Sequence, residues 1–234
     1  MNSAAFFDMD GVLLRGESQF SFLLWCVRHG VAPQLRALPV LVRYACYVAG
    51  LSHDALNLRQ SGFELLRDVP VEEMQRSASR FFQKDFARRL RRQATPLLET
   101  HRRSGHSLVL VTSACEPVAL PVASRLKLNA TIATRLIVNR SSYTGQRALP
   151  EPYGEGKRLL VELFCEEHSI SPDDCFAYGD HHSDAALLEC VGHPVAANPN
   201  RKLESLARVK GWPIVDLDGP TLPAVIIPRV ILSC

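Results

Sequence analysis

Short strand-like runs alternate with longer periodic stretches through the second half of the chain. A short apolar run bounded by polar residues predicts a buried strand, and apolar residues at helical spacing predict a helix. Strands and helices that alternate in this way form parallel sheets joined by crossovers. The strand-like runs are residues 108–111, 175–178 and 193–197, and the helical stretches are residues 117–126, 159–168 and 185–190.

The first half has a different pattern. After a short apolar run that ends at Phe7, residues 17–106 carry apolar residues at helical spacing without strand alternation. Turn-forming residues interrupt this region near residues 30–33, 50–52 and 69–70. The first half therefore predicts one strand followed by a series of helices.

Together the two halves predict an α/β fold, a doubly wound parallel sheet with an inserted helical cap. Residues 1–15 and 105–234 would form the core, and residues 16–104 the cap. Residues 131–138 and 142–147 predict a hairpin in front of the helical stretch at residues 159–168. An open sheet of this type binds its ligand at the carboxyl ends of the strands.

Composition narrows the class of protein. The chain has 234 residues, 47% of them hydrophobic, which is enough for one sizeable core and a subdomain. A net charge of +3 is too small to indicate nucleic acid. No N-terminal segment has the pattern of a signal peptide, so we expect a cytoplasmic protein. The seven cysteines include no Cys-x-x-Cys pair, which argues against a zinc cluster, and their odd number does not favour a complete disulfide framework.

Two carboxylates follow the first predicted strand. Asp8 and Asp10 stand in Phe6-Phe7-Asp8-Met9-Asp10-Gly11, and alternate residues of a strand face the same side. Such a pair suits a hard cation, although aspartate is also common at turns and helix N-caps. Three further polar segments lie at strand ends or helix starts. They are Thr112-Ser113, Gly154-Glu155-Gly156-Lys157, and Gly179-Asp180-His181-His182-Ser183-Asp184.

These four segments, in this order, resemble the four motifs of the haloacid dehalogenase superfamily of phosphatases. The helical region between the first two motifs and the Gly-x-Gly-Lys segment are most similar to the phosphoserine-phosphatase-like branch. The resemblance implies that Asp8 attacks phosphorus to form an aspartyl-phosphate. It also implies that Asp10 protonates the leaving alcohol and then activates water.

The resemblance further implies a Mg²⁺ cofactor. One oxygen of Asp8, the backbone carbonyl of Asp10, and the carboxylate of Asp180 would bind the ion, with Asp184 supporting this shell. Thr112, Ser113 and Lys157 would bind the substrate phosphate. Val12, Ser113 and His181 depart from common family residues without removing an essential charge. His181 and His182 could tune the pH profile or contact the substrate, although such histidines are more often ordinary loop residues.

The cap would choose the substrate. Its apolar stretch at residues 38–51 predicts a buried cap helix or, less favoured, a helix that faces lipid; nearby arginines and prolines argue against a membrane span. A basic cluster follows, predicted to be a solvated helix face or an anion-binding surface. If the cap resembles that of phosphoserine phosphatase, Glu17 and Arg59 are candidate contacts for an amino-acid substrate. The basic cluster contains Lys84, Arg88, Arg89, Arg91 and Arg92.

Three functions are compatible with these residues. The first is a Mg²⁺-dependent phosphomonoesterase, acting on a small metabolite such as phosphoserine or, as an alternative, on a lipid phosphate. The second is a phosphotransferase or phosphomutase, in which an alcohol replaces water as the acceptor. The third is a non-catalytic binding protein. A dehalogenase is disfavoured, because the carboxylates of Asp10, Asp180 and Asp184 would have no purpose without metal and phosphate. Cys115 could be a nucleophile of another class, but no histidine is adjacent in sequence.

Overall fold

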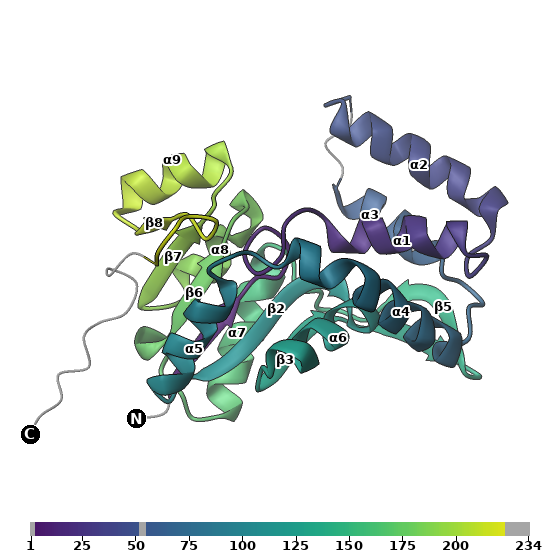
Figure 1. Cartoon of the computed structure of the whole chain (residues 1–234). Coiled ribbons are helices and arrows are strands. Elements are labelled where there is room, and N and C mark those ends of the chain that lie inside the picture. The colour runs from purple at the N-terminus through teal and green to yellow at the C-terminus, as the bar shows by residue number, and fades with distance from the viewer. Residues whose placement is uncertain (1–2, 52–54, 223–234) are drawn as a thin grey trace, which may run out of the picture.

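The computed structural model describes residues 3–51 and 55–222 and contains one large parallel sheet (Figure 1). Its six strands lie in the order β3-β2-β1-β6-β7-β8, and every neighbouring pair is parallel. The predicted doubly wound parallel α/β fold is therefore confirmed. The strands are β1 (Ala4–Phe7), β2 (Ser107–Cys115), β3 (Ala130–Thr134), β6 (Phe176–Gly179), β7 (His193–Ala197) and β8 (Ile214–Val215).

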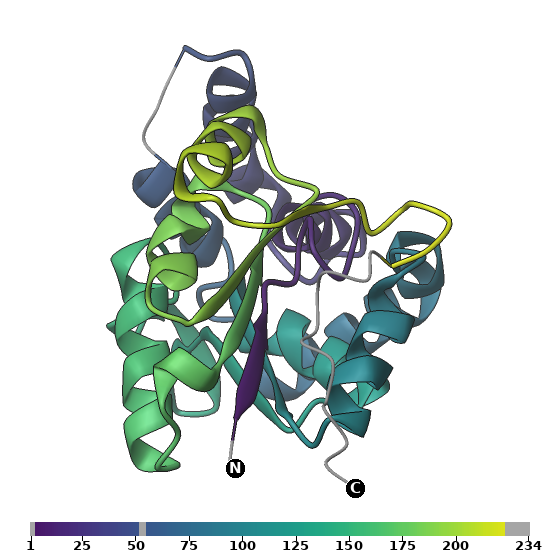
Figure 2. The same cartoon turned by 90° about the vertical axis from the view of Figure 1, so that its left-hand side faces the viewer.

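Helices cover both faces of the sheet. Successive side chains of a strand point to opposite faces, and apolar side chains on both faces must be buried. In β1, Phe7 packs in one apolar cluster and Phe6 in a second cluster on the other face. Figure 2 shows the sheet between green helices on one side and teal helices on the other. The Phe7 face is covered by α5 (Ala94–Arg103) and α6 (Glu116–Leu126), and the Phe6 face by α7 (Glu155–Glu167), α8 (Ala185–Glu189) and α9 (Arg201–Lys210).

Four helices lie between the first two strands in sequence. They are α1 (Ser18–Arg28), α2 (Gln34–Val48), α3 (Ala55–Glu64) and α4 (Val71–Arg89). Phe22, Phe63 and Met74 from this region belong to the same apolar cluster as Phe7, so the helical region packs continuously onto the sheet. Because α5 packs directly on β2, we propose that the core begins before Ala94, ahead of the predicted residue 105.

Helix α2 lies on the outer side of the cap, away from the sheet (Figure 1). The predicted buried helix is only half correct. Val40 is 8% exposed, whereas Leu35, Leu38 and Val42 are 93%, 66% and 54% exposed. Pro39 lies inside the helix without ending it. Among the described residues, no helix is long and apolar enough to cross a membrane.

The predicted hairpin needs correction. Residues 131–138 form two strands: β3 joins the large sheet, while β4 (Leu136–Asn139) pairs with β5 (Ser142–Arg147) in a separate antiparallel ribbon. Only Arg135 separates β3 from β4, so the hydrophobic pattern shows no break between them. The break arises because β3 pairs with β2, a contact between segments distant in the sequence.

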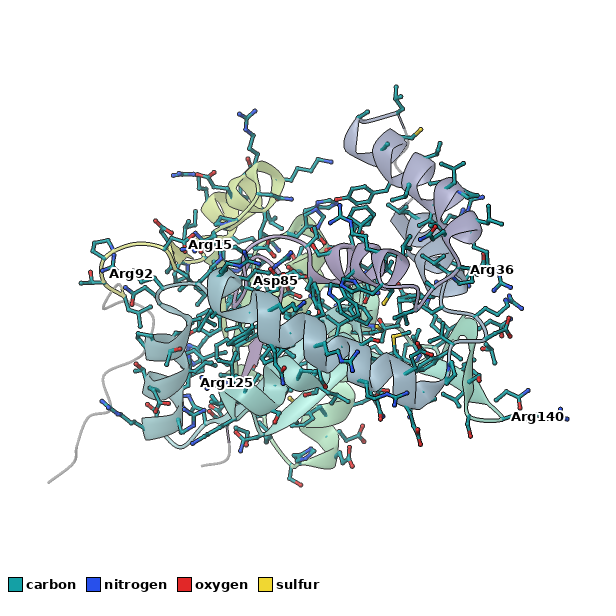
Figure 3. All side chains as sticks on the ribbon, turned by 45° about the vertical axis from the view of Figure 1, so that its right-hand side comes forward. Arg15, Arg36, Asp85, Arg92, Arg125 and Arg140 are labelled. Atoms are coloured by element: carbon teal, nitrogen blue, oxygen red, sulfur yellow. The ribbon has the colours of Figure 1, made fainter. Side chains whose placement is uncertain are left out.

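The predicted basic cluster is not one solvated face. Helix α4 ends at Arg89, which forms an ion pair with Asp85 one turn earlier. Arg91 lies beyond the helix and pairs with Asp218 near the described C-terminal end. Arg92 is exposed on the surface, well away from Arg36 on the cap (Figure 3). Ion pairs with acidic residues therefore neutralise part of the cluster.

A polar chain crosses the apolar layer beneath α5. His101 is fully buried, its Nε2 lies 2.7 Å from the Tyr178 hydroxyl oxygen, and its Nδ1 lies 2.7 Å from Nδ1 of His106. Burial and the neighbouring His106 lower the pKa of His101 to about 3. The imidazole is therefore neutral, with one nitrogen donating and the other accepting.

Acid should destabilise the protein through His101. An unfolded histidine titrates near pH 6.5, so the unfolded state binds the proton more tightly than the folded state. The contribution to stability is complete above pH 6.5 and is lost as the pH falls toward 3. We expect a loss of about 2 kcal/mol between pH 7 and pH 5.

Urea unfolding at pH 7 and pH 5 measures this loss. His101→Gln should show a smaller decrease between the two pH values than the wild type, whereas the control His168→Gln, on the surface, should keep the full decrease. An unchanged decrease in His101→Gln would contradict the assignment.

Candidate active site

The carboxyl ends of β1 and β6 meet where the strand order reverses. The chain moves outward from β1 through β2 to β3 and then returns to β6 on the other side of β1. Ligands of open α/β sheets bind in this crevice. Asp8 directly follows β1, and its backbone N–H donates to the Tyr178 carbonyl at 3.0 Å. Asp180 directly follows β6, so the fold brings the first and last motifs together.

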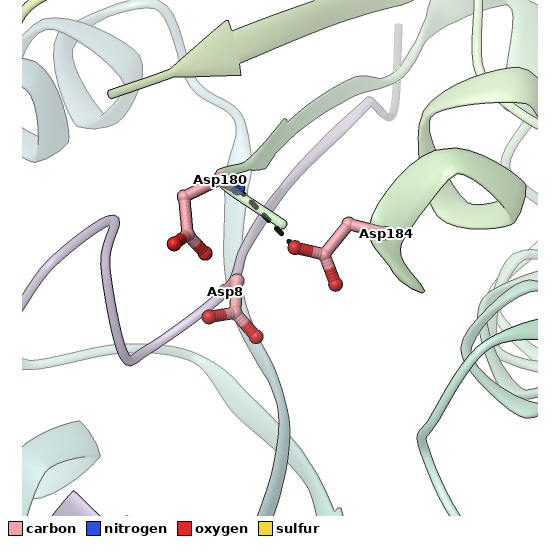
Figure 4. Close-up of side chains that lie close together, drawn as sticks. All are labelled: Asp8, Asp180 and Asp184. Atoms are coloured by element: carbon pink, nitrogen blue, oxygen red, sulfur yellow. Dashed lines mark hydrogen bonds between the residues drawn. The ribbon is translucent and has the colours of Figure 1, made fainter. Parts of the chain in front are cut away.

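Three carboxylates converge here (Figure 4). Asp8, Asp180 and Asp184 each offer one oxygen, and these oxygens lie within 4.8 Å of one another. Asp8 and Asp184 are buried, and Asp180 is half-buried. The side chain of Asp10 is not part of this group.

Lys157 neutralises part of this charge. It lies in the first turn of α7, is 2% exposed, and donates to Oδ1 of Asp8 and, at 2.7 Å, to Oδ1 of Asp184. Burial lowers the pKa of Lys157, but Asp184 and Asp8 outweigh it and raise the pKa above its ordinary value. The ammonium group therefore remains charged between the two carboxylates.

Asp184 also holds the loop that carries Asp180. A short 3₁₀ helix, η2 (His182–Asp184), follows β6, as η1 (Pro172–Asp174) precedes it. Oδ2 of Asp184 accepts from the backbone N–H groups of Asp180 and His181 at 3.2 and 3.1 Å. Since both Asp184 oxygens accept hydrogen bonds, this residue positions the loop and Lys157.

Gly11 makes room for Asp180. A Cβ at Gly11 would lie 2.0 Å from Oδ2 of Asp180, well inside van der Waals contact. Gly11 also has φ of +84°, a backbone conformation that other residues rarely adopt. The glycine of the first motif therefore allows the side chain of the last motif to approach.

Asp10 links the site to the cap. Its Oδ2 accepts from the backbone N–H and the hydroxyl of Ser18, at 2.9 and 2.8 Å, and so caps α1. Its Oδ1 is buried and has no hydrogen-bond partner among the described residues. Burial, Glu17 and Asp8 raise the pKa of Asp10 to about 8.

The hydroxyl pair lies within a strand rather than after it. Strand β2 extends to Cys115, beyond Thr112 and Ser113, with an irregularity in its pairing to β3 after Thr112. Oγ1 of Thr112 accepts from the N–H of Ala114 at 3.1 Å, which leaves its proton to donate. Both residues line the cavity that contains the carboxylates.

The cavity has a volume of about 510 Å³ and lies between core and cap. The core contributes all seven predicted site residues to its lining, and Glu17 and Arg59 from the predicted cap line it as well. The predicted site residues on the cavity wall are Asp8, Asp10, Thr112, Ser113, Lys157, Asp180 and Asp184.

Sequence reasoning missed the contacts that hold Arg59. Its Nη2 donates to the Ser113 carbonyl at 2.7 Å, and its Nε donates to Oε1 of Glu151 at 3.2 Å. Its guanidinium lies 5.1 Å from the centre of the Tyr153 ring. Glu151 also pairs with Arg147. No motif marks Glu151 or Tyr153, because only folding brings them to α3.

The structure bears on two alternatives from the sequence. Burial raises the pKa of Cys115 to about 12, so its thiol is not an activated nucleophile. Nδ1 of His181 accepts from the Ser183 N–H at 3.3 Å and lies 2.9 Å from the Ser183 hydroxyl, the bonds of a helix cap. His181 still lines the cavity, whereas His182 is exposed.

Comparison with known proteins agrees with this geometry. The family model for haloacid dehalogenase-like hydrolases matches residues 5–189. The chain belongs to this family. A probable phosphatase of Mycobacterium tuberculosis is 27% identical over 220 residues, covering 93% of this chain and 76% of the relative. A phosphoserine phosphatase of the same organism is 26% identical over 219 residues, covering 92% and 71%. The similarity to the phosphoserine-phosphatase-like branch is therefore confirmed.

A solved structure has the same fold. A Bordetella pertussis protein of unknown function superposes with a TM-score of 0.82 at 26% identity, covering 92% of this chain and 99% of that one. The similarity extends over the cap as well as the sheet, since nearly the whole of both chains is covered. The architecture of this haloacid dehalogenase-like hydrolase thus has an experimental counterpart.

The carboxylate group of the hydrolase fits a divalent cation. Burial raises the pKa of Asp8 to about 7, opposed by Lys157, and burial with Asp8 and Asp184 raises that of Asp180 to about 9. These raised pKa values indicate that Lys157 alone does not balance the negative charges of Asp8, Asp180 and Asp184. Clustered carboxylate oxygens are the ligands that Mg²⁺ prefers, and a bound cation would restore their ionised forms.

Gly11→Ala should cost more stability than a glycine substitution with the same backbone conformation and free space. Gly30 is the matched control, with φ of +71° and no atom within 4 Å of an added Cβ. We expect a loss of about 1 kcal/mol for Gly30→Ala, from backbone strain alone. Gly11→Ala should lose a further 1–3 kcal/mol, roughly, through the collision with Asp180. Chemical denaturation measures both, and equal losses would contradict the collision.

Proposed function

We propose that this hydrolase is a Mg²⁺-dependent phosphomonoesterase that works through an aspartyl-phosphate on Asp8. The observation that carries the proposal is that Asp8, held by Lys157, lines the same cavity as Asp10, whose buried Oδ1 has no hydrogen-bond partner among the described residues. A nucleophile and a proton carrier side by side are what phosphoester cleavage by covalent catalysis requires.

In the first step, a carboxylate oxygen of Asp8 forms a bond to phosphorus as the bond to the leaving oxygen breaks. Asp10 gives its proton to that oxygen; its raised pKa, about 8, favours the protonated form that this step needs. Lys157 and the Thr112 hydroxyl stabilise negative charge on the phosphoryl oxygens. Mg²⁺ bound by Asp8, Asp180 and the Asp10 carbonyl would supply further positive charge there.

In the second step, the Asp10 carboxylate takes a proton from a water molecule that attacks the same phosphorus. The bond from phosphorus to Asp8 breaks, which releases inorganic phosphate and regenerates both aspartates. A phosphotransferase differs only in that an alcohol replaces this water. A small phosphate ester is the partner in either case, with phosphoserine suggested by one relative's name and a lipid phosphate as the alternative. A cytoplasmic location remains a prediction from the sequence.

Asp8→Asn should abolish hydrolysis, because a neutral amide does not attack phosphorus.

Asp10→Asn should slow hydrolysis by about 10²–10⁴, the usual range for general acid–base catalysis. Steady-state turnover of an alkyl phosphate, whose leaving group needs a proton, measures both. More than a tenth of wild-type turnover in folded Asp8→Asn, or an unchanged rate in Asp10→Asn, would reject the respective role.

Substitutions of Asp180 and Lys157 should affect different steps, metal binding and phosphate binding respectively. Asp180→Asn should raise the Mg²⁺ concentration required for half-maximal activity and reduce the increase in melting temperature that Mg²⁺ produces in the wild type. Lys157→Ala should weaken phosphate binding and turnover at saturating metal. Identical Mg²⁺ titrations of wild type and Asp180→Asn, by activity and by melting, would exclude a metal role for Asp180.

A further inference from the structure

Much of the cap side of the catalytic cavity is apolar, although Glu17, Gln19 and Arg59 also line it. Phe20 and Leu23 of α1, Val40 and Tyr44 of α2, and Leu58 and Phe63 of α3 line the same cavity as Asp8 and Lys157. The rings of Phe20 and Tyr44 stack with 10° between their planes, which fixes part of this wall. Three helices thus present apolar side chains opposite the carboxylates.

The cations that line the cavity already have partners. Lys157 binds Asp8 and Asp184, Arg91 pairs with Asp218, and Arg59 donates to Glu151 and to the Ser113 carbonyl. Among the described lining residues, each lysine and arginine thus has at least one acidic partner. Glu151, the partner of Arg59, is buried and is shared with Arg147.

Glu17 adds a negative charge to the wall. It lies at the start of α1, next to Ser18, which binds Asp10. Its charge would repel a substrate carboxylate that lies near the scissile bond.

From this lining we infer that the substrate is a phosphomonoester whose leaving group has an apolar portion, bound by the apolar side chains of the cap wall. The inference rests on the proposed phosphomonoesterase function. It concerns the alcohol that is released when the phosphate ester is cleaved. Apolar contact with the wall excludes water from both surfaces and so contributes to binding. Val40 is a specificity-determining residue in this arrangement.

A homologous series of alkyl phosphates tests the inference. The ratio kcat/KM for ethyl, butyl and hexyl phosphate should rise by about fourfold per added methylene until the cavity is filled. Hexyl phosphate should exceed phosphoserine, which has a carboxylate and no apolar tail. A flat series, or phosphoserine turned over more efficiently than hexyl phosphate, would overturn the inference while leaving the phosphomonoesterase function intact.

Failure of the phosphomonoesterase function can be told apart from failure of the inference about the apolar wall. If the folded protein with saturating Mg²⁺ cleaves none of these esters and no activated aryl phosphate, the phosphomonoesterase function fails and the inference fails with it. Activity on the aryl phosphate with a flat alkyl series counts against the apolar wall alone.

Helix α2 offers a matched pair of variants. Val40 is 8% exposed and lines the cavity, whereas Val42 is 54% exposed and does not. Val40→Thr should lower kcat/KM for hexyl phosphate by about fourfold, the value of one apolar carbon, and leave ethyl phosphate unchanged. Val42→Thr should change neither. Equal effects of the two variants, or equal effects of Val40→Thr on both esters, would contradict a role for the wall.

Two sources could supply an apolar phosphomonoester, a free metabolite or a lipid. Short-chain phosphatidic acid in solution and long-chain phosphatidic acid in vesicles distinguish them. Hydrolysis confined to soluble esters supports a free metabolite. Preference for vesicles, reduced by Val42→Glu on the exposed face of α2, supports a lipid.

Discussion

The buried contact of Lys157 with Asp8 and Asp184 is the interaction on which the rest of the site depends. It joins β1, α7 and η2, which lie far apart in the sequence, at the reversal point of the sheet. Without the ammonium, three carboxylates would share one buried space with no cation among the described side chains that touch them. Removing one partner of such a group leaves an uncompensated buried charge, which is strongly destabilising.

The cap is coupled to this group through short polar contacts. Ser18 at the start of α1 donates twice to Asp10, and Arg59 of α3 donates to the carbonyl of Ser113 in β2. Both contacts end on predicted catalytic or phosphate-binding residues. A shift of the cap would therefore alter the position of Asp10 as well as the shape of the cavity, so substrate binding and proton transfer are physically linked.

The sequence predicted the positions of most secondary structure, and all seven of its predicted site residues line the cavity. It succeeded because strand ends are marked locally, by an apolar run followed by a polar residue such as Asp8 or Asp180. It failed where the deciding contact is distant. The end of β3 before Arg135 depends on its pairing with β2. Which face of α2 is exposed depends on which helices pack against it.

The sequence by itself indicated the fold class through local periodicity, and it indicated the family and the carboxylates through the resemblance of four motifs to those of haloacid dehalogenase-like proteins. Only the tertiary structure decided how the charges are compensated. Glu151, Tyr153 and Asp218 carry no motif, yet they engage Arg59 and Arg91 and leave much of the cap wall apolar. Ion pairing depends on distances of a few ångströms between side chains, and segments distant in the sequence acquire such distances only when the chain folds.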